Sequence, residues 1–291
     1  MRFVDVKNDI AFHKIFGNAN QTICLISFLN AVLQLEEGRR VVSVTIENPY
    51  LFPTVPTGKT SIIDIRATDQ EGRKFIVEMQ VADKKGFDKR VQYYAARDYS
   101  SQIEKGDDYQ LLRPAYFIAI LDFVFTQSLH YFSTHQTIDI ETGENLLKDV
   151  KYYFIELTKF NKTLEDLYSM MDKWTYFIKN AENLTVIPED VEDAGLKTAY
   201  TEADKQTWTQ KELNVYDDSK VRERDAIQEQ LFMLEKGEAK GRREGKEEGK
   251  EEKEEEMIVA MHKAGIAIAQ MAAITQKTEE EVAEIIAKYS R

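Results

Sequence analysis

The sequence has too few cysteines, histidines and long apolar runs to fit several classes of protein. Its only cysteine, Cys24, lies in the apolar run ICLISFL, so a disulfide framework and a cysteine zinc site are both excluded. The four histidines are scattered, at positions 13, 130, 135 and 262. No apolar run approaches the roughly 18 residues that span a bilayer, and the amino-terminal MRFVDVKNDI lacks the apolar stretch of a signal peptide. We therefore expect a cytoplasmic protein without a membrane partner.

Positive charge is also scarce, since the net charge is −12. The acidic residues are concentrated in the second part of the chain. Residues 1–100 carry 14 Lys and Arg against 12 Asp and Glu, whereas residues 101–291 carry 25 against 39. Binding to a phosphate backbone requires a local basic surface and not a basic protein as a whole. The charge therefore leaves DNA open as a partner of the amino-terminal part.

The periodicity of apolar residues predicts an α/β, or α+β layered, domain with a mixed sheet flanked by helices. Helices are expected over 9–16, 21–35 and 85–104, and helical spacing dominates from 163 to 231. Strands are expected over 41–48, 59–67, 73–81, 115–123, 129–139 and 150–157.

The composition changes sharply near the carboxyl end. Residues 236–256 are almost entirely Lys, Arg, Glu, Gly and Ala, with a glycine at every fourth position from Gly237 to Gly249. We predict three parts: a domain over 1–231, a charged helical spacer over 232–256, and a small helical segment over 257–291. The last part could be a helix-turn-helix or a helical hairpin that self-associates.

Two carboxylates are expected beside each other on neighbouring strands. Because side chains alternate along a strand, the second strand should place Ile63 and Ile65 on one face and Asp64 on the other. On the third strand, Glu78 and Gln80 share a face. The turn between these strands can bring Asp64 beside Glu78.

Such a pair is costly in an apolar setting, because like charges repel and burial removes their hydration. A divalent cation removes that cost. Mg²⁺ takes oxygen ligands, usually one or two carboxylates plus waters and substrate phosphate oxygens. The arrangement indicates phosphodiester hydrolysis, in which Gln80 could orient the attacking water. In the simpler interpretation, both carboxylates are solvated residues on an open face of the sheet.

Asp64, followed after thirteen residues by Glu78-Met79-Gln80, resembles the D…(D/E)XK pattern of the PD-(D/E)XK nuclease superfamily. More specifically, the chain is similar to the Rpn family of recombination-promoting nucleases, whose members are often described as transposases. The similarity rests on six ordered landmarks: NDIAFHKIFG (8–17), LISFLNAVL (25–33), SIIDIRA (61–67), FIVEMQ (75–80), KRVQYYAARDYSSQIEKGDDY (89–109) and YFIELTKF (153–160). It covers almost the whole chain.

The resemblance implies a restriction-endonuclease-like core, Mg²⁺-dependent DNA cleavage with Mn²⁺ as an alternative ion, and a link to recombination or mobile elements. By matching position, Asp64 and Glu78 would be metal ligands, with the carbonyl of Met79 as a third. Gln80 would occupy the catalytic position to which the pattern assigns lysine. This departure leaves the catalytic cation unassigned.

Residues outside the hairpin are expected to complete the site. Asp9 or Lys14, on the first helix, could complete the catalytic group. On the helix after the hairpin, Arg90 and Tyr94 lie one turn apart and could contact phosphate or brace the carboxylates. Contact with DNA is also expected for two nearby lysines, Lys85 and Lys89.

Two other functions stay open. The chain could be a catalytically weak DNA-binding or assembly protein of the same fold, in which Gln80 marks lost activity. It could also be a protein-binding regulatory module that uses its acidic surface. Because each chain offers one site and cutting both strands of DNA needs two, a homo-dimer or higher homo-oligomer is expected.

Overall fold

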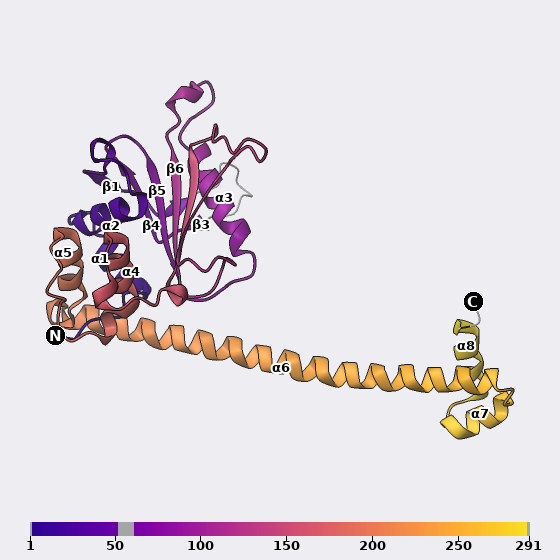
Figure 1. The fold of residues 1–291 in the computed structure, drawn as a ribbon. Coiled ribbons are helices and arrows are strands. Elements are labelled where there is room, and N and C mark those ends of the chain that lie inside the picture. Colours follow the sequence, from indigo (N-terminus) through magenta and orange to yellow (C-terminus); the bar gives the residue numbers. More distant parts are fainter. Residues whose placement is uncertain (1, 52–60, 290–291) are drawn as a thin grey trace. The chain divides into compact units, whose positions relative to one another are not determined.

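A six-stranded mixed sheet forms the centre of the amino-terminal part of the protein (Figure 1). The structure is a computed structural model that describes residues 2–51 and 61–289. The strands follow the spatial order β1 (Val44–Ile46), β4 (Ile65–Asp69), β5 (Lys74–Gln80), β6 (Ala115–Leu121), β8 (Val150–Glu156) and β7 (Phe132–Gln136). The pairs β5–β6 and β6–β8 are parallel and the other pairs are antiparallel. The prediction of an α/β layered fold with a mixed sheet is confirmed.

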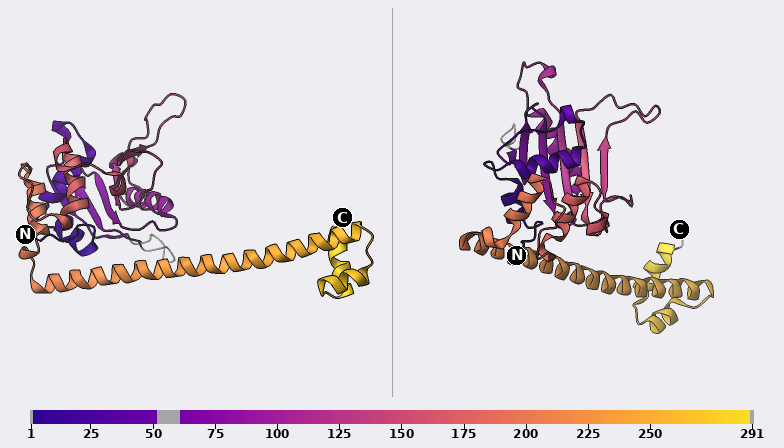
Figure 2. Two further views of the ribbon diagram at one scale, coloured as in Figure 1. Left: turned by 60° about the horizontal axis from the view of Figure 1, so that its bottom comes forward. Right: turned by 60° about the vertical axis from the view of Figure 1, so that its left-hand side comes forward.

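The parallel strands bring three carboxyl ends to one edge of the sheet. Parallel neighbours need a crossover, and α3 (Phe87–Ser100) supplies it between β5 and β6. All seven residues of β6 are buried, as expected for a strand that is covered on both faces. Two long connections, 101–114 and 137–149, leave the sheet at the edge where β6 and β8 begin (Figure 2). The opposite edge, where β5, β6 and β8 end, carries the candidate site.

Helices cover both faces of the sheet (Figure 1). One face carries α1 (Asp9–Phe16), α2 (Ile23–Leu33), α4 (Met170–Asn180) and α5 (Ala194–Ala203), and the larger apolar cluster lies beneath them. α3 covers the other face, where it packs in a second apolar cluster with Ile76, Phe117 and Phe154. Short 3-10 helices connect these elements at Glu37–Arg39, Tyr109–Leu111, Leu157–Lys159, Leu164–Asp166, Ala181–Asn183 and Lys205–Thr207.

The prediction of a single strand over 59–67 is wrong. Its described part consists of β3 (Ser61–Ile62), which pairs with β2 (Tyr50–Leu51) in a separate small sheet, and β4; residues 59 and 60 lie outside the described residues. The chain bends at Asp64 between them. The bend interrupts the alternation of side chains, so Ile63 packs in the α3 cluster while Ile65 packs in the larger one. The predicted shared face of these two isoleucines is therefore also wrong.

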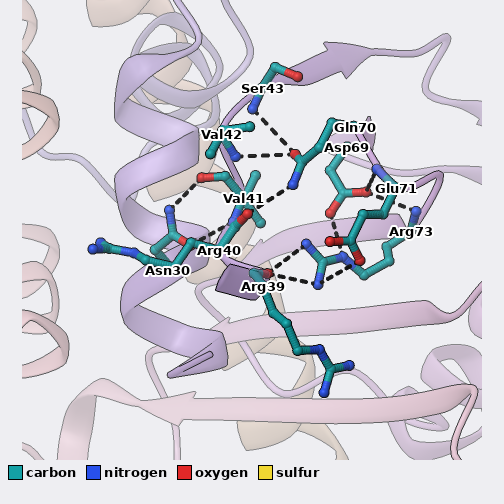
Figure 3. A network of polar contacts seen from close by, with 10 residues as sticks. All are labelled: Asn30, Arg39, Arg40, Val41, Val42, Ser43, Asp69, Gln70, Glu71 and Arg73. Atoms are coloured by element: carbon teal, nitrogen blue, oxygen red, sulfur yellow. Dashed lines mark hydrogen bonds and ion pairs between the residues drawn. The ribbon is translucent and has the colours of Figure 1, made fainter. Parts of the chain in front are cut away.

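A polar network fixes the turn between β4 and β5 (Figure 3). Asp69 and Arg73 are both buried, and their side chains form an ion pair at 2.5 Å. Both terminal nitrogens of Arg73 donate to the backbone oxygen of Arg39 at 3.0 Å. The side chain of Gln70 donates to the backbone oxygen of Arg40 at 2.8 Å. These bonds tie the segment before β1 to the turn and help to set the pairing register of β4 and β5.

Residues Val221–Arg291 form a second compact unit, and Met1–Lys220 form the unit that holds the sheet. The division falls inside α6 (Gln210–Lys263), a continuous helix of 54 residues. At its end, Ile258 packs against residues of α7 (Ile268–Thr275) and α8 (Glu279–Tyr289) in a small apolar core. The predicted boundaries at 231 and 256 stay a prediction. Among the described helices there is no candidate for a membrane span, because none combines sufficient length with sufficient apolar character.

Candidate functional site

The carboxylates of Asp64 and Glu78 meet where the β4–β5 hairpin ends. The last pair of the two strands is Ile65 with Val77, so one further step places Asp64 opposite Glu78. At this point the chain bends out of the ladder, and the backbone N–H of Met79 donates instead to Oδ2 of Asp64 at 2.8 Å. The side chain of Asp64 thus takes the place of a backbone acceptor, which fixes its position at the strand end.

Glu78 is the most unusual acid of the fold. Its residue is 3% exposed, and among the described residues its hydrogen-bond donor is the neutral amide of Gln80, 3.3 Å from Oε2. Among the described residues, four other buried acids each have a cation within 4 Å: Asp69 with Arg73, Asp98 with Arg66, Glu156 with Lys159, and Asp172 with Lys162. A fifth, Asp204, accepts instead from the backbone N–H of Gln206. An acid buried without such a partner is destabilising in its ionised form.

Burial and mutual repulsion raise the pKa values of both carboxyl groups. Burial is the main cause for Glu78, the charge of Asp64 adds to it, and the pKa rises to about 8. Burial also raises the pKa of Asp64 to about 6, although the N–H of Met79 opposes the shift. Perturbed acids of this kind are concentrated at functional sites.

Arg90 brings a positive charge to the pair through Gln80. Its Nη2 donates to Oε1 of Gln80 at 2.6 Å, and the amide nitrogen of Gln80 donates to the carbonyl of Met79 at 3.1 Å and to Glu78. The guanidinium charge lowers the pKa of both carboxyl groups. The ring of Phe87, 5.2 Å from the guanidinium carbon, supports Arg90 from below. Gln80 is therefore held in one orientation by a cation from α3.

The start of α1 reaches the same edge of the sheet. Lys7, just before α1, forms an ion pair with Asp122 at 2.7 Å, and the N–H of Asp122 donates to the carbonyl of Gln80 at 2.9 Å. From α1, the charge of Asp9 raises the pKa of both carboxyl groups and that of His13 lowers the pKa of Asp64. Sequence reasoning did not assign a role to His13, although its spacing of four residues from Asp9 places both on one side of the helix.

The structure does not bring every predicted residue to the pair. The ammonium of Lys14 binds Glu212 at 2.5 Å and lies over the ring of Trp208, at 4.8 Å from its centroid. Tyr94 is buried in the apolar cluster beneath α3. Two predicted DNA contacts, Lys85 and Lys89, are exposed near the amino end of α3.

The donor set fits a hard divalent cation. In the described part of the chain, no group of three or more His, Cys, Asp or Glu side chains is placed to hold a metal ion. The site instead offers the carboxylates of Asp64 and Glu78, with the carbonyl of Met79 beside them. Mg²⁺ is commonly held by only one or two carboxylates, with waters and substrate phosphate oxygens as further ligands. A cation here would also remove the repulsion that raises the two pKa values.

Residues 6–230 match the family described as PD-(D/E)XK nuclease family transposase, and the chain belongs to that family. Members are typically nucleases, such nucleases generally use divalent metals, and a transposase implies DNA binding. The resemblance seen in the sequence is thus confirmed. No curated protein and no solved structure matches the chain.

The raised pKa of Glu78 predicts a pH-dependent stability of the metal-free protein. The pKa of Glu78 is about 8 in the folded chain against the ordinary 4.5. The contribution of this group to the free energy of unfolding is therefore complete below about pH 4.5 and is lost as the pH rises through 8. Each unit of pKa difference corresponds to about 1.4 kcal/mol. Thermal unfolding with a chelator should therefore show Glu78→Gln to be more stable than wild type at pH 8, and much less so at pH 5.

The exposed Glu141 provides the control, since Glu141→Gln removes the same charge from a solvated position. This variant should follow the wild-type curve at both pH values. A wild-type protein and a Glu78→Gln variant that lose stability in parallel between pH 5 and pH 8 would contradict the assignment of Glu78 as a strained acid.

Proposed function

We propose that the protein is a Mg²⁺-dependent DNA endonuclease that hydrolyses phosphodiester bonds in recombination or in mobile elements. The observation that carries the proposal is the pair Asp64 and Glu78. Among the described residues Glu78 is buried with only the neutral amide of Gln80 as a donor, whereas four other buried acids have a cation within 4 Å. Two like charges at this edge destabilise the fold, so a purely structural role does not explain them. A role in holding a metal ion does explain them.

The protein groups have distinct tasks in this proposal. Asp64, Glu78 and the carbonyl of Met79 hold the ion, and Mn²⁺ suits the same oxygen ligands. When bound, the ion supplies stabilisation of charge on the phosphate and a lowered pKa of a water molecule. Gln80, fixed by Arg90, hydrogen-bonds and orients water. Asp9 adds negative charge near the same position.

Arg90 takes over the electrostatic role of the lysine in the D…(D/E)XK pattern. The neutral side chain at position 80 cannot stabilise negative charge on a phosphate, whereas a guanidinium is always charged. Lys85 and Lys89, exposed near the amino end of the same helix, contact the DNA backbone further from the reacting bond. α3 thus supplies the positive charge that Gln80 of the hairpin does not carry.

A cleavage assay on supercoiled plasmid tests the metal site. We expect Asp64→Asn and Glu78→Gln each to reduce Mg²⁺-dependent nicking by at least about a hundredfold, because the metal supplies several kcal/mol of transition-state stabilisation. Glu141→Gln should cleave like the wild type. Wild-type rates in both site variants, with folding verified by circular dichroism, would refute the proposal.

The role of Arg90 in the chemical step can be tested separately from a role in DNA binding. We expect Arg90→Met to lower the nicking rate at saturating DNA by roughly a hundredfold, the usual cost of removing one group that stabilises developing charge. In that background, Gln80→Lys should restore part of the rate, because it returns a cation to the hairpin. Lys89→Met is the matched control and should weaken DNA binding without lowering the saturated rate. Failure of Gln80→Lys to recover any activity would argue against this role.

A second copy of the chain is the expected partner in cleavage of both strands. The consecutive residues Leu231 to Leu234 of α6 are 55–62% exposed on all sides of the helix, an arrangement that favours burial against another chain. Residues 236–246 carry five Lys and Arg against two Glu, and residues 247–256 carry two against seven. An antiparallel second α6, centred near residue 246, would set the basic segment of each helix against the acidic segment of the other. It would also place Leu231–Leu234 against residues 259–262, which include Val259 and Met261. We propose that α6 mediates homo-oligomerisation.

Light scattering coupled to gel filtration tests this assembly. Leu231→Asp should shift the protein to the monomer, because a charge in the apolar segment would be buried without a partner. Ala239→Asp introduces the same charge at an exposed position of α6 and should leave the oligomer intact. A wild-type monomer, or an unchanged Leu231→Asp oligomer, would contradict the interface.

The neutral Gln80 also favours a second candidate, a DNA-binding or assembly protein with weak catalysis. Its amide bonds to the carbonyl of Met79, one of the proposed metal ligands, and competes with an ion for it. The two candidates differ in calorimetry with Mg²⁺ and Mn²⁺. Binding that Glu78→Gln abolishes supports the nuclease, whereas DNA binding without any metal binding supports the alternative.

A further inference from the structure

A groove with aromatic walls lies on the α3 face of the sheet. Phe154 of its wall is in register with Glu78, two strands away across Ala119. The groove has a volume of about 360 Å³ and lies between α3, β7 and β8. Its walls include Asp88 and Gln92 from α3, Phe125 from the segment after β6, and three residues of the outer strands, His135, Tyr152 and Phe154. The proposed nuclease chemistry uses none of these side chains.

The groove is built into the same packed layer as the candidate site. The ring of Phe87, which supports Arg90, contacts Phe125 at a centroid distance of 5.3 Å. Phe125 contacts Phe154 at 4.9 Å, and Phe154 contacts the ring of His135 at 5.1 Å. A continuous series of rings therefore leads from Arg90 into the groove. A strand of DNA with a phosphate at Arg90 would have its neighbouring bases within reach of these rings.

The chemistry of the walls matches a nucleobase. Aromatic faces bind bases by stacking with little regard to sequence, because every base has a π face. Polar groups stand at the rim: the carboxylate of Asp88 is an acceptor for exocyclic amino groups, and the amide of Gln92 offers further hydrogen bonds. The volume is at the lower end of the roughly 300–1,000 Å³ of small-ligand sites, which is enough for one base.

The charge around the groove favours a nucleic-acid strand over an apolar peptide. Lys85 and Lys89 are exposed near the amino end of α3, and Arg90 follows on the same helix. The ammonium of Lys89 lies 3.6 Å from the carboxylate of Asp88 in the wall. Cations beside aromatic surfaces are the combination with which proteins bind single-stranded DNA, phosphates to the cations and bases to the rings. An apolar peptide would gain no attraction from these cations.

We propose that this groove binds an unpaired nucleobase of the DNA strand that is held at the Asp64–Glu78 site. The inference rests on the proposed function and deepens it, because it assigns the substrate class. A base that enters the groove must leave its stack, at a cost that is least in single-stranded or distorted DNA. The protein therefore prefers single strands, mismatches or junctions to regular duplex.

Fluorescence anisotropy with labelled DNA tests the groove independently of cleavage. All variants carry Glu78→Gln, which prevents turnover, and the probes are a short single strand, its regular duplex, and the same strand with abasic sites. Tyr152→Leu keeps an apolar side chain on β8 but removes the ring. We expect it to weaken single-strand binding roughly tenfold and to leave duplex binding within twofold. The abasic strand should bind to both proteins equally and weakly.

Tyr109→Leu is the matched control, because Tyr109 is 80% exposed on a distant 3-10 helix. It should bind all three probes like its parent. Equal single-strand affinity in the parent and in Tyr152→Leu, or an equal loss for strand and duplex, would overturn the groove as a base site. If the groove instead binds a side chain of a partner protein, the parent and Tyr152→Leu should bind the single strand with equal affinity.

The outcomes for groove and nuclease are distinguishable. If the wild type fails to cleave any plasmid while Tyr152→Leu still loses single-strand affinity selectively, the nuclease proposal fails and base binding stands. If the wild type cleaves regular duplex and Tyr152→Leu binds all probes normally, the nuclease stands and the groove proposal fails.

Discussion

The burial of two like charges beside each other is the constraint on which the rest of the structure depends. Asp64 is held by the N–H of Met79 because β4 starts only after the bend, and Glu78 is buried on the opposite strand without a cation. Around them, α3 supplies Arg90 and the segment before α1 is tied to the end of β6 by Lys7 and Asp122. The fold gives up stability at this edge while most of its other buried acids are paired with cations, which is the usual compromise of a site prepared for a ligand.

Positive charge reaches the site from a different element than the acids. The hairpin contributes two carboxylates and a neutral amide, while the cation comes from the first turn of α3 and acts through Gln80. This division changes what the site requires of its surroundings. The hairpin alone positions the two carboxylates, but the packing of α3 on the sheet, through Phe87 and its aromatic neighbours, determines where the guanidinium of Arg90 lies relative to them.

The sequence predicted the fold class, the limits of α1 and the hairpin with its acids, because all three depend on local periodicity and spacing. The bend at Asp64 could not be predicted, since the residues around it have the alternation of an uninterrupted strand. The ion pair of Lys14 could not be predicted either, because its partner, Glu212, lies 198 residues away in the chain. The link between Arg90 and Gln80 likewise depends on how a helix packs on a sheet, which periodicity does not encode. Contacts between distant segments thus decide which side chains reach the pair, and local patterns leave these contacts open.

The network around Asp69 and Arg73 lies at the far end of β5 from Gln80, roughly 20 Å away at the usual rise of a strand. A slip of one residue in the pairing of β4 and β5 would turn Glu78 to the opposite face and place Met79 opposite Asp64. The buried guanidinium of Arg73 at the turn therefore helps to set the register that places the two acids opposite each other. A genetic screen for inactive proteins should for that reason recover two separate groups of positions, one at the acids and one at the distant turn that sets their register.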